Sequence, residues 1–340
     1  MKMPSLSSSR LPFSLSLSLL ASLSATGAHA ENNDAYLQQY GADNVSATLQ
    51  TGDGNIAAVT QYGVLNQSQV VQTGVSNEVS VIQSEEGYPH VSQIEQQGDT
   101  NLIDLQQHMG SGSYATLYQE GTGNVFLIDQ QFYANSLDAA AVGTGNRLEV
   151  MQFSYGSGET RQEGAGNRIG LWQEVYGYGG GAVLHQSGDR NQLDMTQIGG
   201  GRYYTGTVYF DQVGADNQGR VRHGGGFNTF EFVQQGDRNS ADITQWGRSS
   251  ELHGRSEGDD NQVTLVQDFD GGVIDLLQQG DANLASVVQE AYYANASITQ
   301  IGDANQASIS QTMSDFLSLG GDSATIIQQG NGNLANAVQQ

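Results

Sequence analysis

The side chains in this 340-residue sequence with the clearest capacity for chemistry are aspartates that directly follow a glycine: Asp53, Asp99, Asp189, Asp237, Asp259, Asp281 and Asp303. Carboxylate oxygens that recur along a chain are typical of calcium ligands. The calcium-binding β-roll, however, is built from GGxGxD nonapeptides, which the sequence lacks. We therefore predict turn-forming and solubilising roles for these aspartates, and no metal site.

Histidine and serine are the next candidates for catalysis. Five of the six histidines follow residue 30, and none of the five lies in an HxxxH pair or beside a second ligand at metal spacing. No nucleophile-elbow motif holds a serine. The sequence therefore predicts a protein that is not an enzyme, with no catalytic residue, no cofactor and no metal.

The first thirty residues predict an export signal. Lys2 and Arg10 precede or flank the apolar run LPFSLSLSLLASL, and Ala28-His29-Ala30 supplies a small-x-small cleavage site. A membrane anchor would need about 20 apolar residues, and no later stretch supplies them. We predict a signal peptide at 1–30, cleaved after Ala30, followed by one domain at 31–340.

Composition excludes several kinds of protein. The chain has 45 Gly, 3 Pro and no Cys, so an exported form has no disulfide framework. The chain has 12 basic and 36 acidic residues. The resulting net charge of −24 disfavours binding to nucleic acid or anionic lipid. Stability must come from some regular feature other than a large core.

That feature is a repeat. The motif GxxN recurs with its glycine at positions that include 41, 52, 63, 74, 98, 121, 143, 164, 188, 214, 236, 258, 280, 302 and 330. The first four glycines are 11 residues apart, and most later ones are separated by about 22. Gln usually stands two residues before the glycine and six residues after the asparagine. A motif that returns at a fixed interval is a building unit rather than a reaction centre.

Residues between these fixed points alternate in polarity. After Asn283, for example, Ala285, Val287 and Gln289 share one face, while Ser286 and Glu290 lie on the other. A period of two with one apolar face predicts a half-buried strand. Each unit is therefore expected to be strand, tight GxxN turn, strand and looser turn, because glycine accepts positive φ and asparagine bonds the nearby backbone.

A single arch of this kind has no partner for its apolar face, but stacked arches do. Stacking predicts an all-β, amyloid-like cross-β solenoid of about 13 rungs with Gln over Gln and Asn over Asn, each amide bonding the next. We predict these structural ladder and turn residues in the last three rungs: Gln278, Gly280, Asn283, Gln289, Gln300, Gly302, Asn305, Gln311, Gln328, Gly330, Asn333 and Gln339.

The pattern resembles the curlin repeat, S-x5-Q-x-G-x-x-N-x-A-x3-Q, of the subunits of curli. It is seen in ATIIQQGNGNLANAVQ (324–339) and ASITQIGDANQASISQ (296–311). The resemblance implies a secreted subunit of extracellular amyloid fibres that serve biofilm matrix and adhesion at the surface of a Gram-negative bacterium, exported through the periplasm. It also implies head-to-tail polymerisation, with other curlin subunits and a curli-type secretion pore with its chaperones as partners.

The sequence departs from that family in its length and in irregular segments expected at 84–95, 197–211 and 311–323. The last motif runs to Gln340, so we expect an uncapped edge that another molecule's first rung, around 39–61, can extend. Stacked carboxylates at Asp237, Asp259, Asp281 and Asp303 are expected to repel one another and to act as gatekeepers that delay assembly.

Two alternatives remain open. The 11-residue spacing at 41–74 is compatible with a minor curlin that nucleates or anchors a fibre. A soluble β-solenoid binding protein is the other possibility, although no flat threonine array or groove of clustered acids appears in the sequence. Aromatics such as Trp172, Trp246, Tyr203-Tyr204 and Tyr292-Tyr293 are compatible with contacts to matrix polysaccharide or a host surface, but single exposed aromatics are common.

Overall fold

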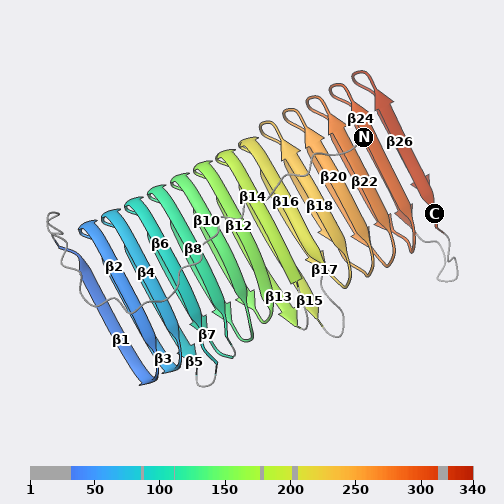
Figure 1. The fold of residues 1–340 in the computed structure, drawn as a ribbon. Coiled ribbons are helices and arrows are strands. Elements are labelled where there is room, and N and C mark those ends of the chain that lie inside the picture. Colours follow the sequence, from blue (N-terminus) through green and yellow to red (C-terminus); the bar gives the residue numbers. More distant parts are fainter. Residues whose placement is uncertain are drawn as a thin grey trace, which may run out of the picture.

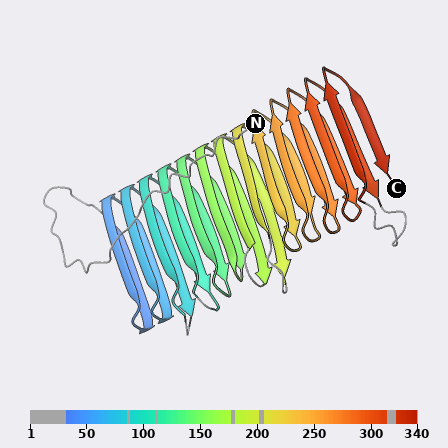
Figure 2. The same cartoon turned by 45° about the vertical axis from the view of Figure 1, so that its right-hand side comes forward.

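The computed structural model describes residues 32–85, 88–110, 112–176, 180–200, 206–312 and 321–339. The predicted signal peptide lies outside these residues. All regular elements in them are β-strands, 27 in number, arranged as two parallel sheets that face each other along a rod (Figures 1 and 2). Among the described residues, no helix is long and apolar enough to cross a membrane.

Odd-numbered strands form one sheet and even-numbered strands form the other, so the chain changes sheet at every turn. The 14-stranded sheet contains β1 (Asp34–Ala42), β3 (Ile56–Val64), β5 (Glu78–Glu85), β7 (Leu102–His108), β9 (Val125–Gln131), β11 (Arg147–Phe153), β13 (Arg168–Tyr176), β15 (Gln192–Gly200), β17 (Gln218–Gly224), β19 (Ser240–Gln245), β21 (Gln262–Asp268), β23 (Leu284–Glu290), β25 (Gln306–Thr312) and β27 (Leu334–Gln339).

The 13-stranded sheet contains β2 (Val45–Asp53), β4 (Gln67–Val75), β6 (Val91–Asp99), β8 (Tyr114–Thr122), β10 (Ser136–Thr144), β12 (Gly156–Ala165), β14 (Gly180–Asp189), β16 (Thr207–Ala215), β18 (Thr229–Gln235), β20 (Glu251–Glu257), β22 (Val273–Gln279), β24 (Asn295–Ile301) and β26 (Ser323–Gln329). The all-β solenoid of strand-turn-strand units predicted from the sequence is confirmed.

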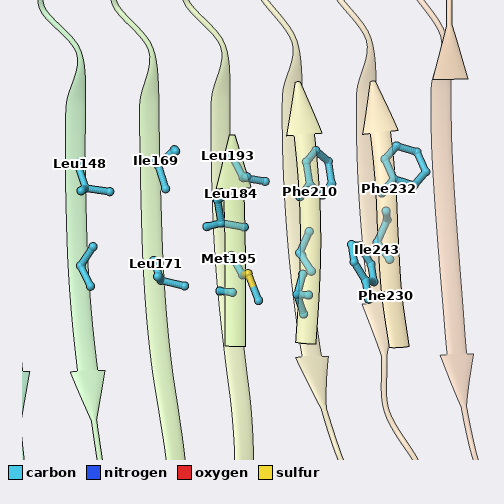
Figure 3. Close-up of a cluster of buried hydrophobic side chains, with 14 of the residues drawn as sticks. Leu148, Ile169, Leu171, Leu184, Leu193, Met195, Phe210, Phe230, Phe232 and Ile243 are labelled. Atoms are coloured by element: carbon cyan, nitrogen blue, oxygen red, sulfur yellow. The ribbon is translucent and has the colours of Figure 1, made fainter. Parts of the chain in front are cut away.

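Each strand pairs with the equivalent strand one coil further on, in the register that the repeat predicts. In the pair β23–β25, Ala285 lies opposite Ala307 and Gln289 opposite Gln311. Within a strand, the second and fourth residues are generally apolar and buried, and the sixth is usually a buried Gln. Figure 3 shows part of the resulting core, where side chains of adjacent coils meet between the sheets: Leu148, Ile169, Leu171, Leu184, Leu193, Met195, Phe210, Phe230, Phe232 and Ile243.

The segments expected to be irregular are more ordered than predicted. Strand β6 already begins at Val91, β15 continues to Gly200, and β16 begins at Thr207, so strand occupies part of 84–95 and most of 197–211. The inserted residues of these segments precede the next strand and leave its register unchanged. Tyr203-Tyr204 and most of 311–323 lie outside the described residues.

Candidate functional site

The GxxN turns place their glycines in direct contact from coil to coil. Gly143 has φ +123°, and a Cβ added there would lie 2.0 Å from the carbonyl oxygen of Gly164 in the next coil. The third position of the same turn, Gly145, has φ +64° with nothing within 4 Å of an added Cβ. Glycine is thus required at the first position by the stacking of turns as well as by φ, which sequence reasoning missed because it treated each turn alone.

Buried glutamines form one hydrogen-bonded ladder inside each sheet. Nε2 of Gln267 donates to Oε1 of Gln289 at 2.9 Å, and Nε2 of Gln289 donates to Oε1 of Gln311 at 3.1 Å. Nε2 of Gln289 also donates to the carbonyl oxygen of Val273, at the start of a strand in the opposite sheet. Each amide therefore links neighbouring coils and also ties the two sheets together.

The motif asparagines form a third ladder, which runs along the side of the rod where the GxxN turns lie. The backbone N–H of Asn305 donates to Oδ1 of Asn283 at 3.0 Å, and the backbone N–H of Asn333 donates to Oδ1 of Asn305 at the same distance. Nδ2 of Asn305 also donates to Oδ1 of Asn283. The asparagine bonds thus run toward earlier coils, whereas the glutamine bonds run toward later ones.

The predicted ladder and turn residues lie in these stacks. Gln278, Gln300 and Gln328 follow one another in the 13-stranded sheet, with amide bonds of 2.9 Å. Gln311 bonds Gln339 at 2.7 Å in the other sheet. Gly280, Gly302 and Gly330 have φ between +98° and +113°. Gln278, Asn283, Gln289, Gln300, Asn305 and Gln311 are fully buried, and exposure increases only in the last coil, at Gln328, Asn333 and Gln339.

The four gatekeeper candidates form a column along the turns. The backbone N–H of Asp237 donates to Oδ1 of Asp259, Asp259 donates in the same way to Asp281, and Asp281 to Asp303, at 2.8–3.0 Å. The last member of the column is Asn331, whose Oδ1 accepts the N–H of Asp303 at 2.9 Å. An amide oxygen therefore serves this contact as well as a carboxylate does. Within the described residues, no group of three His, Asp or Glu side chains is arranged to hold a metal ion.

This column allows charge to be removed without loss of the turn bond. Changing Asp259 and Asp281 together to Asn is expected to shorten the assembly lag, because adjacent carboxylates about 4.8 Å apart repel by about 1 kcal/mol in water. Thioflavin kinetics would measure the lag. The matched control is Glu231→Gln with Glu251→Gln, which removes two charges from an outward strand face; an equal shortening in both variants would contradict a special role for the turns.

Three residues interrupt the glutamine ladders. Ala141, Ser256 and His223 occupy Gln positions in β10, β20 and β17. Among the described residues, neither ring nitrogen of His223 has a hydrogen-bond partner, and neither does Oε1 of Gln245 in the next coil. Burial lowers the pKa of His223 from 6.5 to about 4. The sequence showed His223 at a ladder position but not the burial of its ring.

The buried ring makes stability depend on pH. Between pH 6.5 and 4 the unfolded chain takes up a proton that folded His223 resists, so folding should weaken by up to about 3 kcal/mol as pH falls through this window. His223→Gln should remove this slope and restore an amide between Gln197 and Gln245. Denaturant unfolding at pH 4 and pH 7 tests this, with His253→Gln on an outward face as control. A slope unchanged by His223→Gln would assign the effect to other groups.

The aromatics examined from the sequence lie on the surface or in turns. Trp172 lies on the outer face of β13 and is 43% exposed. Its ring packs on the ring of Phe153, with 5.5 Å between the two ring centroids. It borders a shallow groove whose lining includes Arg168 and Asp194, which form an ion pair at 3.5 Å. Trp246 and Tyr292-Tyr293 lie in the turns that follow β19 and β23.

The two ends of the rod differ from its middle because, among the described residues, their strands have partners on one side only. Every residue of β1 is exposed, and its inward Leu37 is 53% exposed, whereas the equivalent Val59 one coil later is 1% exposed. At the other end, β27 leaves Ala335 and Ala337 only partly buried against the core. Within the part of the chain that the structure describes, both ends therefore present unpaired strand edges together with part of the open core.

Comparison with known proteins supports the repeat assignment. The family model described as the curlin associated repeat matches residues 30–63, a segment that contains β1, β2 and most of β3. No curated protein matches the chain. The matched segment has the same Gln, Gly and Asn positions that recur through the remaining coils.

Proposed function

We propose that this member of the curlin-repeat family is a secreted structural subunit of extracellular, curli-like amyloid fibres, which grow when one molecule adds to the strand edges of another. The observation that carries the proposal is the pair of open edges. β1 and β2 at one end, and β26 and β27 at the other, present matching Gln positions and are each joined by a GxxN turn, with partly uncovered core between the two sheets. An uncovered strand edge is a template for a matching strand.

The proposed place of action is the cell surface of a Gram-negative bacterium, in the biofilm matrix, after export by the predicted signal peptide. The partners are further copies of the chain, other curlin subunits, and a curli-type secretion pore with its chaperones. A structural role agrees with the absence of a catalytic motif in the sequence. Matrix polysaccharide or a host surface is a further candidate partner, for which exposed Trp172 beside the groove is the relevant feature.

A second candidate function is a minor curlin that nucleates or anchors the fibre. The observation in its favour is that GxxN occurs at both ends of the first two coils, at Gly41 and Gly63 as well as at Gly52 and Gly74. A nucleator would accelerate assembly of a separate major subunit when present in trace amounts. A fibre subunit would instead account for the mass of the fibre.

Assembly of the purified protein tests the main proposal. Protein without residues 1–30, diluted from denaturant, is expected to form fibres that give a meridional reflection at about 4.8 Å, the spacing of paired strands. X-ray fibre diffraction and electron microscopy are the measurements. Protein that stays monomeric for days at tens of micromolar would contradict the proposal.

A further inference from the structure

The strand edges at the two ends of the rod belong to unequal sheets. The first and last described strands, β1 and β27, both lie in the 14-stranded sheet, and the 13-stranded sheet begins at β2 and ends at β26. If a second copy were stacked in the same orientation, with its β1 on β27, no strand would lie between β26 and its β2. That opening would be two strand spacings, about 9.6 Å, and would leave Ile326 facing water.

We propose, resting on the fibre function above, that successive molecules are related by a half-turn about the fibre axis, so that β1 of one molecule pairs with β26 of the preceding one and β2 pairs with β27. The half-turn exchanges the two sheets at each junction. Both sheets then continue without an opening, because the two-strand arch of β1 and β2 lies directly on the arch of β26 and β27.

The first coils are built to fit either sheet. Strands β1 to β4 each have nine residues with Gln at the sixth position and Gly at the eighth, although they alternate between the sheets. Further along the rod, the GxxN turns lie mainly at one end of the strands, and the opposite end has longer or irregular turns. The 11-residue spacing returns inside the rod at Gly214, Gly225 and Gly236, but His223 replaces the Gln before Gly225. Four successive strands with both Gln and Gly occur at the start, where a rotated neighbour would require interchangeable sheets.

The turns that would meet also have the same shape. Gly41 and Asp43 have φ of +112° and +56°, and Gly330 and Gly332 have φ of +98° and +68°. Gly41 lies at the opposite end of its own molecule's strands from Gly52, so only a half-turn brings it onto Gly330. An added Cβ at Gly330 would touch only Asn333, at 3.8 Å, which shows that the outer side of this glycine is open to a neighbouring turn.

The direction of the side-chain hydrogen bonds along the rod also fits this contact. Glutamine Nε2 atoms donate toward later coils throughout, as Gln300 does to Gln328, so Gln328 and Gln339 would donate to Gln39 and Gln50 of the next molecule. Asparagine Oδ1 atoms accept N–H groups from later coils, as Asn305 does from Asn333, so Asn333 would accept the N–H of the next Asn44. Ser323 to Gln340 contains no charged residue, so no like charge would meet Asp43 across the junction. Asp322, directly before β26, is the acidic residue that would lie nearest to Asp34 of the next molecule.

Cysteine cross-linking distinguishes this junction from its alternatives, because the chain has no cysteine of its own. Outward Thr325 would lie beside outward Tyr36 of the next molecule, with Cα atoms about 4.8 Å apart, within reach of a disulfide. Fibres of Thr325→Cys with Tyr36→Cys, assembled reduced and then oxidised, should lose their monomer band and give a ladder of covalent oligomers on non-reducing gels.

Two matched variants test the other junctions. Tyr36→Cys with Asn336→Cys would cross-link only if β1 pairs with β27, and Ala47→Cys with Thr325→Cys only if β2 pairs with β26 after β1 leaves the sheet. In the half-turn arrangement each of these pairs lies on opposite outer faces, so both should remain monomeric on the gel.

Cross-linking by either matched variant, or fibres in which no variant cross-links, would overturn the half-turn. Each variant is first examined by electron microscopy. If the unmodified protein itself forms no fibres, both the proposed function and the half-turn fail; fibres with a different cross-link leave the function standing and remove the half-turn alone.

Discussion

Gly143→Ala is expected to destabilise the rod strongly, whereas Gly145→Ala in the same turn should cost only about 1 kcal/mol, the usual penalty for a left-handed alanine. At Gly143 the new methyl group would have to displace the backbone of the next turn, since only 2.0 Å separates it from the oxygen of Gly164. Because backbone in a continuous stack has little room to move, we expect a loss of about 4 kcal/mol or more.

Denaturant unfolding of the two variants measures the difference directly, and hydrogen exchange in β10 to β13 would show where the stack opens. Position 145 is a fair control, because residues other than glycine take the same left-handed conformation elsewhere, among them Thr100, Arg190 and Ala282. Equal losses in the two variants would mean that the turns separate easily and that φ alone selects glycine.

Removing one coil of ladder amides should have the second large effect. With Gln278, Asn283 and Gln289 all changed to Ala, Oε1 of Gln300 and Oε1 of Gln311 keep their burial but lose their donors. Each buried group left without a partner costs about 1–3 kcal/mol, so the coil should lose several kcal/mol and fibre assembly should slow.

The control for this variant replaces Ser286 and Glu290, the outward residues of the same coil, with Ala. Assembly lag and elongation rate are compared by thioflavin fluorescence, and stability by denaturant unfolding. If the outward variant slows assembly as much as the amide variant does, the ladders are incidental to growth.

The regular features of this fold follow from the sequence because the repeat carries them. The period of about 22 residues gives the coil, alternation gives the buried face, and aligned Gln278, Gln300 and Gln328 give the register. What depends on neighbouring coils was not evident. The contact that demands Gly143 arises between turns, and the opposite senses of the Gln and Asn bonds depend on amide orientation, which no spacing specifies.

The aspartates in the turns also combine a feature that the sequence predicts with one that depends on the neighbouring coil. The sequence identified Asp259 and Asp281 as turn residues. Only the structure shows that their carboxylates accept backbone N–H groups from the preceding coil. The irregular segments were predicted too long, because the alternation inside 197–211 is obscured by glycines and tyrosines although strand β16 begins at Thr207. The unequal numbers of strands in the two sheets became visible only from the strand pairing.

The positions of the ladder interruptions bear on how the rod would carry a pulling force. Ala141 lies between Gln130 and Gln152 along the chain, His223 between Gln212 and Gln234, and Ser256 between Gln245 and Gln267, so each defect in one sheet is flanked by intact amides in the other. Among the described coils, one cross-section, between β18 and β19, meets a missing amide bond in both sheets. Within those coils, His223 makes no bond to Gln245 in one sheet, and Nε2 of Gln234 has no partner opposite Ser256 in the other. A crack that starts at Ala141 must break the intact bond between Gln130 and Gln152 to cross the rod, whereas one that starts between His223 and Gln245 meets no intact glutamine bond in either sheet of the described rod. Under a pulling force, the boundary between β18 and β19 is therefore expected to open first.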